Sequence, residues 1–272
     1  MNWPIALSTG ILLDQPLLEV LLQIKEAGFK LIEVTAHAMH FDYKDLDLVT
    51  RVRDKMDNLD LHTVSMHAPY GESIDLTMLD EGDRKRSVAE VTAAVDALRI
   101  LGGTKLVVHA GSVVNEANKD IPGRMSQSLR SLTEIYGYCQ RSNIKLVIEN
   151  MLGHLVGGRN EELQWILKRL PQQNLAICLD TGHSFLAGNL QKSIRIFASY
   201  LTLVHAHDNN EVYDDHLPPG EGKINWPQFL DALAGVDFGG EIVIEVQNKE
   251  EDSSILQRAW HSACFLKRLF PE

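Results

Sequence analysis

The feature that most constrains the fold of this chain is a repeated alternation of short apolar or β-branched runs with longer stretches of helical periodicity. Eight such runs begin at intervals of roughly 25–45 residues, the length of a βα unit. The runs are Ile5–Ser8, Leu31–Thr35, His62–Met66, Lys105–His109, Lys145–Glu149, Leu175–Leu179, Leu201–His205 and Glu241–Glu245. No low-complexity tract or linker divides them, so the pattern predicts a single (β/α)8 TIM barrel domain over residues 1–272.

A doubly wound open sheet is the competing architecture for strands that alternate with helices in a chain of this length. Nucleotide-binding sheets of that kind carry a glycine-rich GxGxxG turn after the first strand. The turn at residues 8–11 reads Ser-Thr-Gly-Ile and lacks this pattern. The closed barrel is therefore the favoured fold.

The composition is that of a soluble globular protein, with 44% hydrophobic and 23% charged residues. The sequence has no apolar run of about eighteen residues and no basic segment leading into an apolar one near its start, so we expect a cytoplasmic protein without membrane contact. The three cysteines lack CxxC spacing, which argues against a thiolate metal site. A net charge of −11 does not favour nucleic acid as a partner, although a local basic groove would escape this average.

The strand ends carry the strongest functional signal. In a barrel strand every second side chain points to the axis, and the others pack under the helices. On this alternation, six strands end on an inward side chain that can bind a metal: His67, His109, Glu149, Asp180, His205 and Glu245. One such histidine alone would be most simply a buried core residue. Six of them converging on the pocket at the carboxyl ends of the strands favour a metal centre.

The chemistry of these side chains indicates which ions they bind. Imidazole and carboxylate ligands suit Zn2+, Mn2+ or Co2+, and neither a thiolate site nor a cage of carbonyl groups is indicated. Glu245 ends an otherwise apolar IVIEV segment, where a buried carboxylate needs a cation or a proton beside it. The sequence thus predicts a divalent cation at the mouth of the barrel.

Two segments next to these strand ends offer further groups. In the Asp180-Thr-Gly-His183 turn, the histidine can fold back over the pocket. Asn150 follows Glu149, where its amide can orient a bound ligand or brace the carboxylate. Both segments are short and come directly after a strand, so their side chains are expected at the same end of the barrel.

The seventh strand and the segment after it add three more groups. His207 lies on the same strand face as His205, so it either faces the pocket or supports it from outside. The Gly/Pro-rich segment 214–222 begins with Asp214 and includes His216, which can supply an extra pair of ligands. By contrast, Lys105 falls at the opposite end of the barrel, where an ion pair would be structural.

Seven short segments resemble one known family. They are SMHAPY (65–70), VVHAG (107–111), IEN (148–150), LDTGH (179–183), VHAHDN (204–209), DDH…GEG (214–222) and IEV (244–246). The chain resembles the xylose-isomerase-like TIM barrels over almost its whole length. That superfamily includes isomerases and epimerases of sugars and sugar phosphates, together with DNA-repair enzymes of the endonuclease IV type.

The resemblance to the ketose 3-epimerase branch implies one divalent ion, often Mn2+. Its ligands would be Glu149, Asp180, His205 and Glu245. It also implies that the two glutamates exchange the substrate proton on opposite faces of a cis-enediolate, and that His183 contacts the substrate. Two positions depart from the epimerases: Leu155 stands where they have a glutamate, and Glu211 stands where they have an arginine.

The resemblance to the endonuclease IV branch implies three Zn2+ ions. Its nine ligand positions all match in residue type: His67, His109, Glu149, Asp180, His183, His205, Asp214, His216 and Glu245. A DNA-repair barrel also needs loops that hold phosphates and wedge into the duplex. Residues 36–45 contain a single lysine, and residues 118–124 contain two cations, so the rim is poor in basic groups.

We therefore expect a metal-dependent isomerase or epimerase of a small sugar or polyol derivative, with one Mn2+ or Zn2+ favoured over as many as three ions. Glu149 or Glu245 would take the proton, and the other would return it. The expected substrate contacts are His67, His109, Asn150, His183 and His207. A dehydratase or lyase would use the same enediolate. The absence of a phosphate-binding glycine-rich helix start favours an unphosphorylated substrate, and homo-oligomer formation stays open.

The second hypothesis is a zinc phosphodiesterase that cleaves abasic DNA, which the nine matching ligand positions support. The third is a metal-dependent binding protein without catalysis, for which the sequence has no special feature. The number of bound metal ions and the response to sugars and abasic duplexes distinguish the three.

Overall fold

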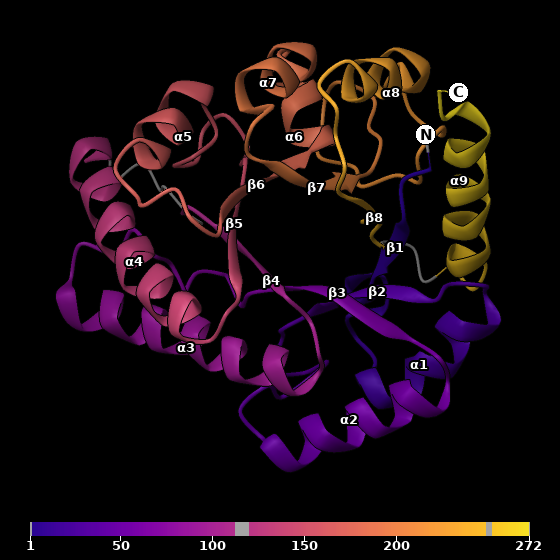
Figure 1. The fold of residues 1–272 in the computed structure, drawn as a ribbon, viewed down its shortest axis with the longest axis horizontal. Helices are drawn as coiled ribbons and strands as arrows, with labels where there is room; N and C mark the ends of the chain where they lie inside the picture. The colour runs from indigo at the N-terminus through magenta and orange to yellow at the C-terminus, as the bar shows by residue number, and fades with distance from the viewer. Residues whose placement is uncertain (1, 112–119, 249–251, 272) are drawn as a thin grey trace.

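The computed structural model describes residues 2–111, 120–248 and 252–271. Its parallel strands pair in chain order, and β8 pairs with β1, so the sheet closes into an eight-stranded barrel. The strands are β1 Ile5–Ser8, β2 Leu31–Thr35, β3 His62–His67, β4 Lys105–His109, β5 Lys145–Glu149, β6 Leu175–Asp180, β7 Leu201–Ala206 and β8 Glu241–Ile244. Figure 1 shows the strands at the centre of the molecule with the helices around them. The predicted (β/α)8 TIM barrel is confirmed.

The helices between the strands cover the outside of the barrel (Figure 1). They are α1 Leu17–Glu26, α2 Leu46–Asn58, α3 Glu81–Ile100, α4 Ile121–Arg141, α5 Asn160–Leu167, α6 Thr181–Leu186, α7 Leu190–Phe197, α8 Trp226–Ala234 and α9 Ile255–Leu269, with a short 3-10 turn at Thr9–Leu12. Gly28 follows α1 at a φ of +108°, which favours glycine, and the ring of Trp260 packs directly against it. Within the described residues, every helix is too short or too polar to cross a bilayer.

The apolar core has two parts, one between the barrel and the helices and a smaller one inside the barrel. The inner part consists of Ala6, Val107, Val147, Ala176, Cys178, Leu203 and Val243. Most of these side chains point inward as the strand alternation predicts. Two residues near strand starts depart from a strict alternation counted back from the strand ends, because Val64 contacts the inner core and Leu201 belongs to the outer one.

Two shifts in strand register explain these exceptions. Between β2 and β3 the pairing advances by an extra residue at Val64, and between β6 and β7 it advances by an extra residue at Thr202. An inserted residue reverses the inward and outward faces on one side of it. The faces agree with the sequence pattern again at the strand ends, where the candidate metal ligands lie.

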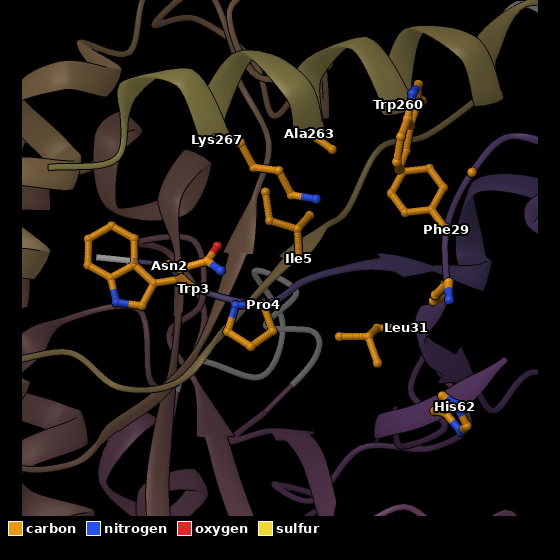
Figure 2. Close-up of a pocket in the computed structure, with 12 residues that line it drawn as sticks. Asn2, Trp3, Pro4, Ile5, Phe29, Leu31, His62, Trp260, Ala263 and Lys267 are labelled. Atoms are coloured by element: carbon orange, nitrogen blue, oxygen red, sulfur yellow. The ribbon is translucent and has the colours of Figure 1, made fainter. Parts of the chain in front are cut away.

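The two ends of the barrel differ in chemistry. At the amino-terminal end of the strands, Lys105 Nζ lies 2.7 Å from Glu241 Oε1, the ion pair expected for a structural role. A cavity of about 570 Å3 also opens there. Figure 2 shows Trp260 facing Phe29 in this cavity, with ring centroids 5.2 Å apart. Its described lining includes no carboxylate and one histidine, so the metal-capable groups gather at the other end.

Candidate metal centre

The metal-capable side chains at the carboxyl ends of the strands converge as expected. They lie in and beneath a cavity of about 700 Å3. In the described chain they form three groups, in each of which the ligand atoms lie within 4.8 Å of one another. The groups are Glu149, Asp180, His205 and Glu245; His67, His109 and Glu149; and His183, His207, Asp214 and His216. All nine ligand positions of the larger expected site are present, and His207 joins them.

The four-residue group around His205 contains both strand-end glutamates and is largely buried. His205 Nδ1 lies 3.2 Å from Glu149 Oε1 and 3.1 Å from Glu245 Oε2. The side chains of His205 and Asp180 have no exposed surface, and that of Glu245 is 19% exposed. Glu149 and Glu245 both line the cavity, so the two carboxylates are accessible to a small molecule in it.

Glu149 also joins the second group, which links β3, β4 and β5. His67 Nε2 lies 3.2 Å from Glu149 Oε2, and His109 Nε2 lies 3.4 Å from the same oxygen. The two histidine nitrogens are themselves 3.2 Å apart. A carboxylate whose two oxygens face different nitrogen sets can bridge two cations.

Backbone carbonyl groups orient three of the histidines. The Nδ1–H groups of His67, His183 and His216 donate to carbonyl oxygens at 2.8, 2.9 and 3.1 Å. Because a carbonyl oxygen only accepts, Nδ1 carries a proton in each ring, and Nε2 is the nitrogen turned toward the neighbouring ligand groups. Metal-binding histidines are commonly oriented in this way.

The charges around His205 fit a divalent cation. Burial raises the pKa of Glu149, but the charge of His205 and the hydrogen bonds from neighbouring histidines outweigh it and hold this pKa well below the ordinary value. Burial likewise raises the pKa of Glu245, and the charge of His205 lowers it further than burial raises it. Together with Asp180, this group combines three carboxylates with one imidazole. Such a set of oxygen and nitrogen donors suits Zn2+ or Mn2+.

The third group is built from α6 and from the segment between β7 and α8. Asp214 Oδ2 lies 3.3 Å from His183 Nε2 and 3.1 Å from His216 Nε2. The rings of His207 and His216 stack with centroids 3.8 Å apart. Gly182 is required by this packing, because a Cβ atom there would lie 2.0 Å from the His207 ring.

The carboxylate of Asp208 holds the segment that carries Asp214 and His216. Its Oδ1 accepts hydrogen bonds from the backbone N–H groups of residues 209 and 224, each at 3.0 Å. Its Oδ2 accepts from the N–H of Gly220 at 3.0 Å and from Trp226 Nε1 at 2.8 Å. Four donors on one buried carboxylate close residues 208–226 into a loop over the cavity.

Two residues expected to contact the substrate also hold Asp180. Asn150 Oδ1 accepts a hydrogen bond from the Asp180 N–H at 2.8 Å. His207 Nε2 lies 2.9 Å from Asp180 Oδ2, and the His207 side chain is fully buried. Neither residue is among those lining the cavity, so direct contact of Asn150 or His207 with a substrate stays a prediction. The other three expected contacts, His67, His109 and His183, do line the cavity.

The sequence analysis missed two residues of this region. Tyr70 lines the cavity with its ring centroid 4.3 Å from that of His109 and is 48% exposed; desolvation at the cavity and the charges of Glu245 and Glu149 raise its pKa to about 12, so its hydroxyl stays protonated. Glu33 in β2 is fully buried beside His205. The signal for Glu33 was a carboxylate within the apolar LIEVT segment, the same kind of signal that identified Glu245.

The described rim offers few cations to a nucleic acid. Lys44 Nζ lies 3.0 Å from Glu90. The buried Arg124 donates to Thr77 Oγ1 at 2.8 Å, which turns it away from a surface role. Lys119, the other cation counted between residues 118 and 124, lies outside the described residues.

In the metal-free protein, we expect the free energy of unfolding to fall as the pH rises from about 6.5 to about 10. Burial lowers the pKa of His183, but the charge of Asp180 and the hydrogen bond with Asp214 raise it to about 10. The stabilisation is complete below the unfolded value of about 6.5 and is lost as the pH rises through 10. Each tenfold difference in proton affinity corresponds to about 1.4 kcal/mol, so the loss reaches a few kcal/mol.

Urea unfolding of chelator-treated protein at several pH values between 6 and 10 measures this loss, roughly over the window between the two pKa values. His183→Asn is the matched variant, because it removes one titrating ring and should make the dependence less steep, while the raised pKa values of His67, His205 and His216 keep its sign. A stability of the metal-free protein that rises with pH over this range would contradict the expectation.

Together, the closed barrel and its strand-end groups define a (β/α)8 protein with a candidate metal centre at the catalytic end of the fold. The family described as xylose isomerase-like TIM barrel matches residues 21–267, and the chain belongs to this family.

Individual relatives represent both kinds of enzyme in the family. The uncharacterized protein MJ1311 of Methanocaldococcus jannaschii is 27% identical over 254 residues, which cover 91% of this chain and 85% of that protein. A solved structure of a D-tagatose 3-epimerase-like protein is 26% identical, with a TM-score of 0.87 and coverage of 98% and 96%. The probable endonuclease 4 of Sulfurihydrogenibium sp. is 25% identical over 220 residues, covering 74% and 77%. These similarities identify an enzyme.

Proposed function

We propose that this protein is a metal-dependent epimerase or isomerase of a small sugar or polyol derivative. The observation that carries the proposal is the pair of carboxylates, Glu149 and Glu245, that face the same nitrogen of His205 at 3.2 and 3.1 Å and line one cavity. Two ionised carboxylates that reach one bound molecule can remove a proton and return it.

The group that would hold the metal is Glu149, Asp180, His205 and Glu245. The excess of buried carboxylates over imidazoles in this group supports one Mn2+ or Zn2+. When bound, such an ion supplies Lewis acidity that makes the hydrogen next to a carbonyl group easier to remove. The two other groups leave room for as many as three ions.

The chain's own residues would carry the proton. One of Glu149 and Glu245 takes the proton from the carbon next to the carbonyl group, and a cis-enediolate of the substrate results. The other glutamate, after taking up a proton from water in the cavity, delivers it to the opposite face, which inverts the carbon in an epimerase, and the first glutamate then releases its proton to water. His183 and the protonated hydroxyl of Tyr70 line the cavity and are suited to bind substrate oxygens.

The cavity wall supports a small, unphosphorylated substrate. Met151, Leu152, Leu155 and Val246 form an apolar part of the lining, and its described residues include no lysine or arginine. Leu155 occupies this wall in place of the glutamate of the ketohexose epimerases, and Glu211 faces Lys223 at 3.4 Å. The ketose accepted here is therefore expected to differ from the substrates of those enzymes in the part that contacts this wall. A cytoplasmic location fits such a substrate.

Hydrogen exchange in D2O tests this function before the substrate is known. The protein loaded with Mn2+, Zn2+ or Co2+ is incubated with a panel of ketoses and polyol-derived ketones, and the products are analysed by NMR. Deuterium at the carbon next to the carbonyl group, together with an epimer or isomer, is the expected result. Absence of exchange with the whole panel, in protein that has bound metal, would count against the proposal.

A second function is supported by the complete set of nine ligand residues in the three groups, which suits a zinc phosphodiesterase acting on abasic DNA. Elemental analysis should then find about three zinc ions per chain, the number of groups. A duplex with one abasic site should also be nicked. One metal ion per chain and an intact duplex would exclude this second function.

A further inference from the structure

Beneath the metal-ligand groups, the barrel holds a carboxylate that the proposed reaction does not use. Glu33 lies in β2, and its side chain has no exposed surface. Its Oε2 accepts a hydrogen bond of 2.7 Å from Ser65 Oγ in β3. A carboxylate placed this deep needs a charged or hydrogen-bonding partner, because burial without one is costly.

The partner of Glu33 is the ring nitrogen of His205 that points away from the other ligands. His205 Nε2 lies 3.0 Å from Glu33 Oε1 and 3.3 Å from Oε2. The opposite nitrogen, Nδ1, faces Glu149 and Glu245. The imidazole thus spans two carboxylate environments, one below it inside the barrel and one at the cavity.

His205 differs in this respect from three histidines around it. In His67, His183 and His216, Nδ1 donates to a neutral backbone carbonyl and Nε2 faces the neighbouring ligands. In His205 the two nitrogens are exchanged, because Nδ1 faces the ligands and Nε2 faces the carboxylate of Glu33. A carboxylate acceptor fixes the tautomer of a ligand histidine and makes its free nitrogen a stronger donor to a metal.

We propose that Glu33 is a positioning residue for the metal centre. By accepting the Nε2–H of His205, it holds a proton on that nitrogen, so that Nδ1 is the nitrogen free to bind when a metal enters the group formed with Glu149 and Glu245. Ser65 fixes Glu33 in turn. The inference rests on the metal centre of the proposed function, but it requires no particular substrate and no particular reaction.

Metal affinity tests the proposal without an activity assay. Titration calorimetry with Mn2+ or Zn2+ compares the unmodified protein with Glu33→Leu, which removes the acceptor, and with Glu33→Gln, which keeps a neutral one. We expect Glu33→Leu to bind the metal about 10- to 100-fold more weakly, and Glu33→Gln to restore part of the loss. The matched control is Glu241→Gln, which removes a carboxylate at the other end of the barrel and should leave the affinity unchanged. Unchanged affinity in a folded Glu33→Leu variant would overturn the proposal.

A second measurement uses the unmodified protein, so it does not depend on how the variants fold. In Zn2+-loaded protein labelled with 15N-histidine, NMR reports which ring nitrogen of His205 carries hydrogen. A proton on Nε2 is expected, and a proton on Nδ1 would overturn the proposal. If the exchange assay excluded the epimerase hypothesis, the metal affinities and the protonation of His205 would be unaffected. The two proposals can therefore be rejected independently.

Discussion

Replacing Glu149 or Glu245 by glutamine is expected to reduce turnover about 10²- to 10⁴-fold, the usual contribution of a general acid or base. Glutamine has nearly the same size and keeps an oxygen that can contact a cation, but it cannot accept a proton at neutral pH. Both carboxylates line the cavity and are held ionised beside His205. The rate of deuterium exchange at saturating metal, with the metal content measured in parallel, is the relevant quantity.

Glu72→Gln provides the matched control for these two variants. Glu72 is exposed and lines the same cavity, but it belongs to none of the three metal-ligand groups. Its replacement should leave the exchange rate within a factor of a few of the unmodified protein, about the scatter expected for a surface substitution. Full activity in either Glu149→Gln or Glu245→Gln, with metal bound, would remove that residue from the proton transfer.

Asp208→Asn should lower the free energy of unfolding by about 3 kcal/mol or more, an unusually large effect for an isosteric change. The carboxylate accepts four hydrogen bonds, two on each oxygen. An amide nitrogen in place of either oxygen would face two N–H donors and could accept from neither. Because these donors close the loop that carries Asp214 and His216, the variant should also weaken the third metal-ligand group.

Urea unfolding and zinc titration together check this expectation. Asp215→Asn is the matched control, since the Asp215 side chain is partly exposed and accepts one hydrogen bond, from the N–H of Asn210 at 3.1 Å. It should change the stability by no more than about 0.5 kcal/mol. If Asp208→Asn were as stable as Asp215→Asn, the four hydrogen bonds would not be what holds this loop.

Local patterns in the chain were enough to predict the architecture and most of the candidate site. Short apolar or β-branched runs, repeated eight times between stretches of helical periodicity, predict the barrel, because strands and helices place apolar residues in different patterns. The observed bounds of all eight strands differ from the predicted ones by at most one residue, as at β8, which ends at Ile244. Residues at strand ends, such as Glu149 and Asp180, could be assigned to one pocket because all strands of this fold run parallel.

What the chain pattern could not supply were the contacts between strands distant in sequence. Glu33 and His205 are 172 residues apart, and only closure of the barrel brings these side chains of β2 and β7 together inside it. The one-residue shifts at Val64 and Thr202 likewise arise from pairing between strands, which the alternation within a single strand does not reveal. Which nitrogen of His205 faces the pocket was also decided in three dimensions. Side-chain types and their period follow from covalent sequence, whereas the partner of each buried charge depends on how the sheet closes.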